Sequence, residues 1–172
     1  LEQGKKVFYT TPLKALSNQK YNDFSEKYGI DKVGLLTGDT SINRGAQIVV
    51  MTTEVFRNML YGTNFGSVTD NLKDVKYVIL DEVHYMNDEQ RGTVWEESII
   101  YCPTNVQIVA LSATVANADK LTEWINTVHS RTELINTDFR PVPLRFYYFD
   151  SSQPNTLLPL LTPNGTLNKK IK

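Results

Sequence analysis

The stretch YVILDEVH (residues 77–84) places two adjacent acids directly after four apolar residues. Near-continuous apolarity over so short a run is typical of a strand buried on both faces, as in a parallel sheet. A carboxylate that leaves such a strand unpaired costs several kcal/mol, so Asp81 and Glu82 need a cation, hydrogen-bond donors or a metal. The stretch therefore predicts a buried strand that ends at a polar edge.

Four further apolar stretches share this pattern, at residues 6–10, 33–36, 47–51 and 106–111. Between them, apolar residues recur near helical spacing at residues 13–24, 55–60, 93–101 and 118–128. Alternation of strand and helix predicts an α/β fold, an open parallel sheet flanked by helices. The segment at residues 62–74 is polar and predicts a loop.

Each predicted strand ends in a compact polar cluster. The clusters are Thr10-Thr11-Pro12, Thr37-Gly38-Asp39, Thr52-Thr53-Glu54, Asp81-Glu82-Val83-His84 and Ser112-Ala113-Thr114. In an open parallel sheet the carboxyl ends of the strands share one edge, where ligands bind. Thr, Ser and Asp are also preferred helix caps, so capping is the alternative for any single cluster. Five clusters together favour a working surface at that edge.

Two adjacent acids suit two different tasks. One can hold a hydrated Mg²⁺, while the next, pointing elsewhere, orients and deprotonates an attacking water. A salt bridge to a nearby lysine or arginine is the alternative for the pair, and a core histidine is the alternative for His84. Chelation of one metal ion by Asp81, Glu82 and His84 together is disfavoured, because adjacent residues leaving a strand point in opposite directions.

Composition limits the kind of partner. The chain has 172 residues, with 18 Lys+Arg against 19 Asp+Glu, so a net charge of -1 excludes a broadly basic coat and any nucleic acid must be gripped locally. One cysteine and two histidines exclude a disulfide framework and a zinc cluster. Without an apolar run of roughly 20 residues, no membrane span is expected, and we expect an intracellular protein.

Several stretches resemble, in order, the motifs of the superkiller-type (Ski-two-like) DExH-box RNA helicases of superfamily two. They are TPLKALSNQK (residues 11–20, motif Ia), LTGD (36–39, motif Ib), MTTE (51–54), DEVH (81–84, motif II) and SAT (112–114, motif III). The run at residues 81–97 is more specific than the short strings and is similar to this family rather than to DEAD-box relatives. Residues 139–144 resemble the exit from the first motor domain of these proteins.

The resemblance implies a RecA-like fold of the P-loop NTPase type and an ATP-dependent RNA helicase, a hydrolase that couples ATP hydrolysis to translocation on RNA and its unwinding. ATP and Mg²⁺ are the implied cofactors. Asp81 would bind Mg²⁺ through water and Glu82 would be the general base. His84, with Ser112 and Thr114, would couple nucleotide state to domain movement.

The resemblance also implies an RNA track that contacts mainly the sugar-phosphate backbone, as suits a motor without base readout. The residues along it would be Pro12, Lys14, Asn18, Gly38, Asp39, Thr52, Thr53 and Arg57. Lys14 and Arg57 have the alternative of solvated helix residues. The bacterial and plastid members look most similar, which implies the cytoplasm for a bacterial protein and a plastid as the alternative.

The sequence holds no G-x-x-x-x-G-K-[ST] phosphate loop, which family members carry upstream of motif Ia. We expect residues 1–149 to be a partial, N-terminally truncated first RecA-like domain and residues 150–172 a tail or linker. The chain alone is expected to be inactive, to need a second RecA-like domain in cis, and to self-associate through an open sheet edge. A DNA helicase, and a non-catalytic nucleic-acid-binding or interaction module of the same fold, are the alternatives.

Overall fold

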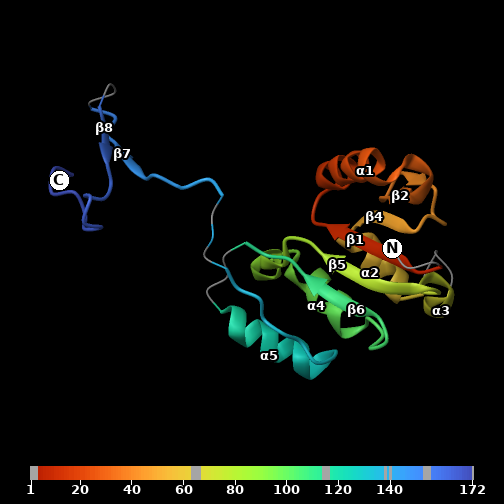
Figure 1. Cartoon of the computed structure of the whole chain (residues 1–172). Coiled ribbons are helices and arrows are strands. Elements are labelled where there is room, and N and C mark those ends of the chain that lie inside the picture. Colours follow the sequence, from red (N-terminus) through yellow and green to blue (C-terminus); the bar gives the residue numbers. More distant parts are fainter. Residues whose placement is uncertain are drawn as a thin grey trace. The chain divides into compact units, whose positions relative to one another are not determined.

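The computed structural model describes residues 4–62, 67–113, 117–137, 139, 141–152 and 156–171. They divide into two compact units, Leu1–Leu134 and Ile135–Lys172 (Figure 1). The division falls before residue 149, where the sequence placed the end of the helicase domain.

A six-stranded sheet forms the centre of the first unit, in the order β3-β2-β4-β1-β5-β6 (Figure 1). The strands are β1 (Lys6–Thr11), β2 (Val33–Leu36), β3 (Ser41–Ile42), β4 (Ile48–Thr52), β5 (Val75–Leu80) and β6 (Gln107–Ala110). All neighbouring pairs are parallel except β2 and β3. The predicted α/β fold with an open parallel sheet is confirmed, and its five parallel strands end at one edge.

Helices connect the strands. They are α1 (Lys14–Tyr28), α2 (Thr53–Leu60), α3 (Val68–Asn71), α4 (Gly92–Ile100) and α5 (Ala118–Val128), with short 3-10 turns η1 (Ile30–Lys32) and η2 (Val83–Asn87). The predicted loop contains α3, a single turn that begins where Ser67 Oγ accepts the Asp70 N–H at 3.1 Å. No helix in the described ranges has both the length and the apolarity that a membrane crossing requires.

Alternation along β4 fills both faces of the sheet. Val49 and Met51 belong to the larger core, which packs the sheet against α2, α4 and α5. Ile48 and Val50 belong to a second core, whose apolar cover comes partly from Tyr21 and Phe24 of α1. Because successive side chains of a strand point to opposite faces, every residue of β4 is buried.

Strand β6 departs from the prediction that all five strands are buried on both faces. Gln107, Val109 and Ala110 are exposed and Ile108 is half-buried. Among the described residues β6 pairs only with β5, so one side of the strand has no neighbour. The prediction was wrong here because an apolar run reveals a strand but not its place in the sheet.

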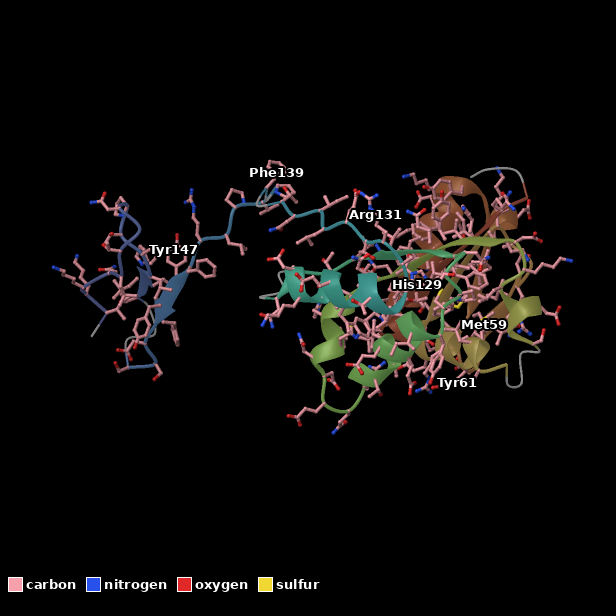
Figure 2. All side chains as sticks on the ribbon, turned by 90° about the horizontal axis from the view of Figure 1, so that it is seen from below. Met59, Tyr61, His129, Arg131, Phe139 and Tyr147 are labelled. Atoms are coloured by element: carbon pink, nitrogen blue, oxygen red, sulfur yellow. The ribbon has the colours of Figure 1, made fainter. Side chains whose placement is uncertain are left out.

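The second unit contains a small antiparallel pair, β7 (Tyr147–Phe149) and β8 (Leu157–Pro159). Each of these two strands is three residues long. Figure 2 labels Phe139 and Tyr147 of this unit, whose side chains are 78% and 50% exposed. The turn at residues 163–165 is closed by an antiparallel bridge between Leu161 and Leu167.

Candidate functional site

Asp81 directly follows β5, and two neutral donors hold its carboxylate. The Tyr9 hydroxyl, from β1, donates to Oδ2 at 2.7 Å, and the Glu82 N–H donates to Oδ1 at 3.0 Å. Burial, and then this bond to Asp81, raises the pKa of Tyr9, so its hydroxyl stays a donor. In the described part of the chain no lysine or arginine pairs with Asp81. The carboxylate is therefore oriented without being neutralised by a cation.

Glu82 lies in a strained turn. Its φ of 56° and ψ of 45° are in the left-handed region, which costs a non-glycine residue on the order of 1–3 kcal/mol and is often found at functional sites. Glu82 Oε2 lies 3.2 Å from His84 Nδ1, although Nδ1 makes no aligned hydrogen bond. The turn thus brings the two adjacent carboxylates to different neighbours, Asp81 to Tyr9 and Glu82 to His84.

Backbone hydrogen bonds bring three of the strand ends together. The Asp81 N–H donates to Thr10 O at 3.0 Å, and the Val83 N–H donates to Leu111 O at 2.8 Å. The DEVH turn is therefore fixed between the ends of β1 and β6. Ser112, next along the chain, is exposed at this edge, and Thr114 lies outside the described residues.

Threonine hydroxyls link the ends of β1 and β4. Thr11 Oγ1 donates to Leu13 O at 3.0 Å and lies 2.7 Å from Ser17 Oγ, and Thr53 Oγ1 donates to Thr11 O at 3.1 Å. Neither α1 nor α2 begins with a side-chain cap bond. The helix-capping alternative is therefore not what these two clusters do.

The predicted nucleic-acid residues fall into buried and accessible groups. Those buried are Pro12, Thr52 and Thr53, and those exposed are Lys14, Asn18, Gly38 and Asp39. The side chains of these three residues are not accessible to a ligand in this structure. The exposed residues lie on α1 and after β2, so two separate segments supply their side chains.

Lys14 and Asp39 form an ion pair between these two segments. The Lys14 ammonium, and then a hydrogen bond of 2.9 Å from Thr37 Oγ1, lower the pKa of Asp39. Arg57 is half-buried, and its guanidinium lies 3.5 Å from Glu97 of α4. Lys14 is thus more accessible to a ligand than Arg57.

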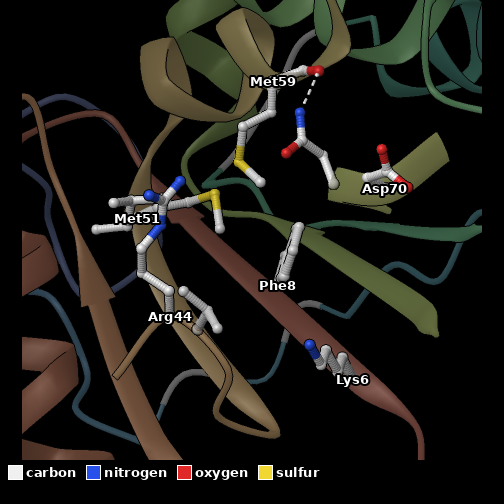
Figure 3. A pocket seen from close by; sticks show the side chains of 9 residues that line it. Lys6, Phe8, Arg44, Met51, Met59 and Asp70 are labelled. Carbon is white, nitrogen blue, oxygen red and sulfur yellow. Dashed lines mark hydrogen bonds between the residues drawn. The ribbon is translucent and has the colours of Figure 1, made fainter. Parts of the chain in front are cut away.

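A hollow of about 140 Å³ lies elsewhere on the sheet (Figure 3). Its lining includes Phe8, Met51 and Met59 with Lys6 and Asp70, but no residue of the predicted site. The candidate site therefore lies at the strand ends, and the hollow is not part of it.

Sequence reasoning missed Tyr9 and Arg91. In the sequence Tyr9 looks like an ordinary apolar strand residue. Its bond to Asp81 forms because β1 and β5 are neighbours in the sheet, and the sequence alone does not reveal the strand order. Arg91 donates to Pro12 O at 2.6 Å and pairs with Glu54. Its only signal was its place in the specific run at residues 81–97.

The site fits a Mg²⁺ held through water. Mg²⁺ keeps several waters and is commonly bound by one or two carboxylates together with substrate phosphates. Asp81 offers one oriented carboxylate of this kind. Among the residues with described placement, no three His, Cys, Asp or Glu side chains gather as a direct metal site.

A parallel sheet with an Asp-Glu pair at its carboxyl edge is consistent with the RecA-like class of domains. Within that class, residues 1–121 match the DEAD/DEAH box helicase family, and the chain belongs to this family.

Proteins similar in sequence to this chain are named as RNA helicases. The chain is 54% identical over 171 residues to the chloroplastic DExH-box ATP-dependent RNA helicase DExH15 of Arabidopsis thaliana, covering 98% of this chain and 14% of that protein. It is 49% identical over 150 residues to the exosome RNA helicase MTR4 of Homo sapiens, covering 87% and 14%. The resemblance to superkiller-type DExH-box RNA helicases is confirmed, and this chain spans about a seventh of these relatives.

A solved structure supports the fold. The chain resembles Mycobacterium smegmatis helicase Lhr bound to ssDNA and AMP-PNP, with a TM-score of 0.53 and 26% identity, covering 71% of this chain and 18% of that one. The RecA-like assignment is therefore confirmed.

Proposed function

We propose that this chain is part of the motor of an ATP-dependent RNA helicase that couples ATP hydrolysis to movement along RNA and its unwinding. The observation that carries the proposal is the Asp81-Glu82 pair, with Asp81 oriented by Tyr9 and Glu82 in a strained turn. The names of the relatives support it. Because the chain spans only about 14% of their length, the activity of the whole protein is a proposal.

In this proposal the two acids divide the chemistry. Asp81 would hold Mg²⁺ through water, and the bound ion would supply positive charge to the phosphate oxygens. Glu82 accepts the proton of the attacking water, for which its freely placed carboxylate is suited. Tyr9 keeps Asp81 in one orientation, and His84 lies beside Glu82. His84, Ser112 and Thr114 would couple nucleotide state to domain movement.

RNA would lie across the carboxyl edge of the sheet. Lys14 and Asn18 offer side chains from α1, and Gly38 and Asp39 offer contacts after β2. Pro12, Thr52 and Thr53 are buried and would shape the floor of this track. Arg57 would reach RNA only after its ion pair with Glu97 breaks. Contacts of this kind hold the sugar-phosphate chain and read no bases.

Hydrolysis needs groups outside these elements. A phosphate-binding loop and a second RecA-like domain in cis would complete the nucleotide site. The 172-residue chain by itself is therefore expected to turn over ATP negligibly. A plastid or a bacterial cytoplasm is the proposed compartment, in keeping with the name of the Arabidopsis relative.

The experiment is an ATPase assay of the full-length parent protein with single-stranded RNA and with DNA of the same base sequence. We expect RNA to stimulate more strongly. Equal or stronger stimulation by DNA would favour a DNA helicase, a reading to which the ssDNA-bound helicase Lhr lends some weight. Absence of turnover with either strand would favour a non-catalytic module.

A further inference from the structure

Arg91 joins three segments that are distant in the sequence. It precedes α4, and its Nη2 donates to Pro12 O at 2.6 Å and to Glu54 Oε1. Pro12 lies in the turn between β1 and α1, and Glu54 lies in the first turn of α2. One nitrogen, with its two hydrogens, therefore ties the β1–α1 turn to the start of α2.

Hydrogen bonds to Asp88 fix the backbone on which the Arg91 side chain stands. Asp88 Oδ1 accepts the Arg91 N–H at 2.9 Å, and Asp88 O accepts the Gly92 N–H at 2.8 Å. The guanidinium carbon lies 5.9 Å from the centre of the Trp95 ring, within reach of cation–π attraction. The Arg91 and Glu54 side chains are each 34% exposed, so solvent screens their ion pair only in part.

Aromatic contacts continue from Arg91 to the DEVH turn. Trp95 is fully buried, and its ring stacks on Tyr85 with 5.7 Å between centroids. Tyr85 lies 5.2 Å from the His84 ring, and His84 Nδ1 lies 3.2 Å from Glu82 Oε2. The contacts therefore run without a break from Arg91 to the proposed general base.

We propose that Arg91 is a positioning residue that couples RNA contact at the β1–α1 turn and at the start of α2 to the carboxylate of Glu82. This inference rests on the proposed function. Both hydrogens of Nη2 are in use, so a shift of Pro12 or Glu54 on RNA binding alters the bond to the other. The same shift moves the guanidinium against Trp95, which packs on the turn that holds Glu82.

The test compares wild-type full-length parent with Arg91→Gln, measuring ATPase without RNA and at saturating single-stranded RNA. We expect the ratio of stimulated to unstimulated rate to fall at least about fivefold, the lower end of usual coupling between sites. The control is Arg131→Gln, which removes an exposed pair with Glu133 and should keep the wild-type ratio. Equal loss of both rates would show a purely structural role and overturn the inference. The inference would also be overturned if Arg91→Gln needed more RNA to reach saturation but then showed the wild-type ratio of stimulated to unstimulated rate.

Glu54→Gln provides a second variant in case Arg91→Gln does not fold. It removes the charge of the ion pair, leaves the bond to Pro12, and is expected to lower the ratio in the same direction. The double variant should be no worse than Arg91→Gln alone, because both changes break one junction. Additive losses would contradict a shared junction. If RNA does not stimulate the ATPase of the wild type, the proposed function and this inference both fail. If RNA stimulates the wild type and the variants show the same ratio as the wild type, this inference alone fails.

Discussion

At the scale of single residues, the fold treats Asp81 and Glu82 differently. Asp81 accepts hydrogen bonds from Tyr9 and from the backbone, which fix its carboxylate. Among the described residues no hydrogen-bond donor is aligned on the Glu82 carboxylate, although His84 Nδ1 lies nearby, and the Glu82 backbone is strained. A fixed carboxylate suits the binding of a hydrated cation, and a loosely held one suits proton transfer.

Cys102 illustrates how burial sets reactivity. Burial raises the pKa of its thiol from 9.0 to about 12. Because the thiolate is the nucleophile, we expect iodoacetamide at pH 8 to modify Cys102 at least about 100-fold more slowly in the native chain than in guanidinium chloride. Above pH 9.0, the ordinary pKa of the thiol, Cys102 ionises in the unfolded chain but not in the folded one. The free energy of unfolding therefore falls as the pH rises above this value. Equal rates in native and unfolded chain would contradict the buried position.

At the scale of elements, α4 depends on a glycine at its start. A Cβ on Gly92 would lie 2.2 Å from Met86 O, a backbone atom that cannot move aside cheaply. Without that contact, Gly→Ala in a helix would stabilise by about 0.5–1 kcal/mol. The close approach reverses the sign, because η2 must shift away from α4 to admit the methyl group.

We therefore expect Gly92→Ala to lower the free energy of unfolding of the 172-residue chain by roughly 1–3 kcal/mol. Urea denaturation measures the change. The matched control is Gly45→Ala, since a Cβ there has nothing within 4 Å and should change stability by less than about 0.5 kcal/mol. A Gly92→Ala variant as stable as its control would contradict the packing of η2 on α4.

Apolar runs and helical spacing in the sequence predicted strands and helices well where these patterns were long or continuous. Strand β2 and helix α5 have the bounds that the sequence predicted, because apolar runs and helical spacing are local signals. The two-residue strand β3 and the one-turn α3 were missed, since so few residues carry no period. The exposure of β6 was missed because it depends on strand order.

The sequence predicted which residue types stand at the strand ends but not the contacts that they make. The strand-end clusters meet at one edge as the parallel sheet requires. The bond from Tyr9 to Asp81 spans 72 positions, and the bond from Arg91 to Pro12 spans 79. Only the three-dimensional order of the strands brings such partners together, so no spacing rule could have found them.

At the scale of the whole molecule, the chain spans a small part of the length of its relatives. The sheet carries the acid pair and several proposed RNA contacts on neighbouring strand ends, so the proposed nucleotide and RNA sites share one edge of the sheet. The matched part of the chain covers 14% of each of the two relatives named above. Turnover is therefore to be measured on the full-length parent.

The most direct test of the central claim is the RNA-stimulated ATPase of that parent, wild type beside Glu82→Gln, which keeps side-chain size and removes the base. We predict that kcat falls by roughly 10²–10⁴-fold while ATP binding is retained, because a general base contributes about that much. Equal activity of the two proteins would contradict the role of Glu82, and equal inactivity would contradict the motor itself.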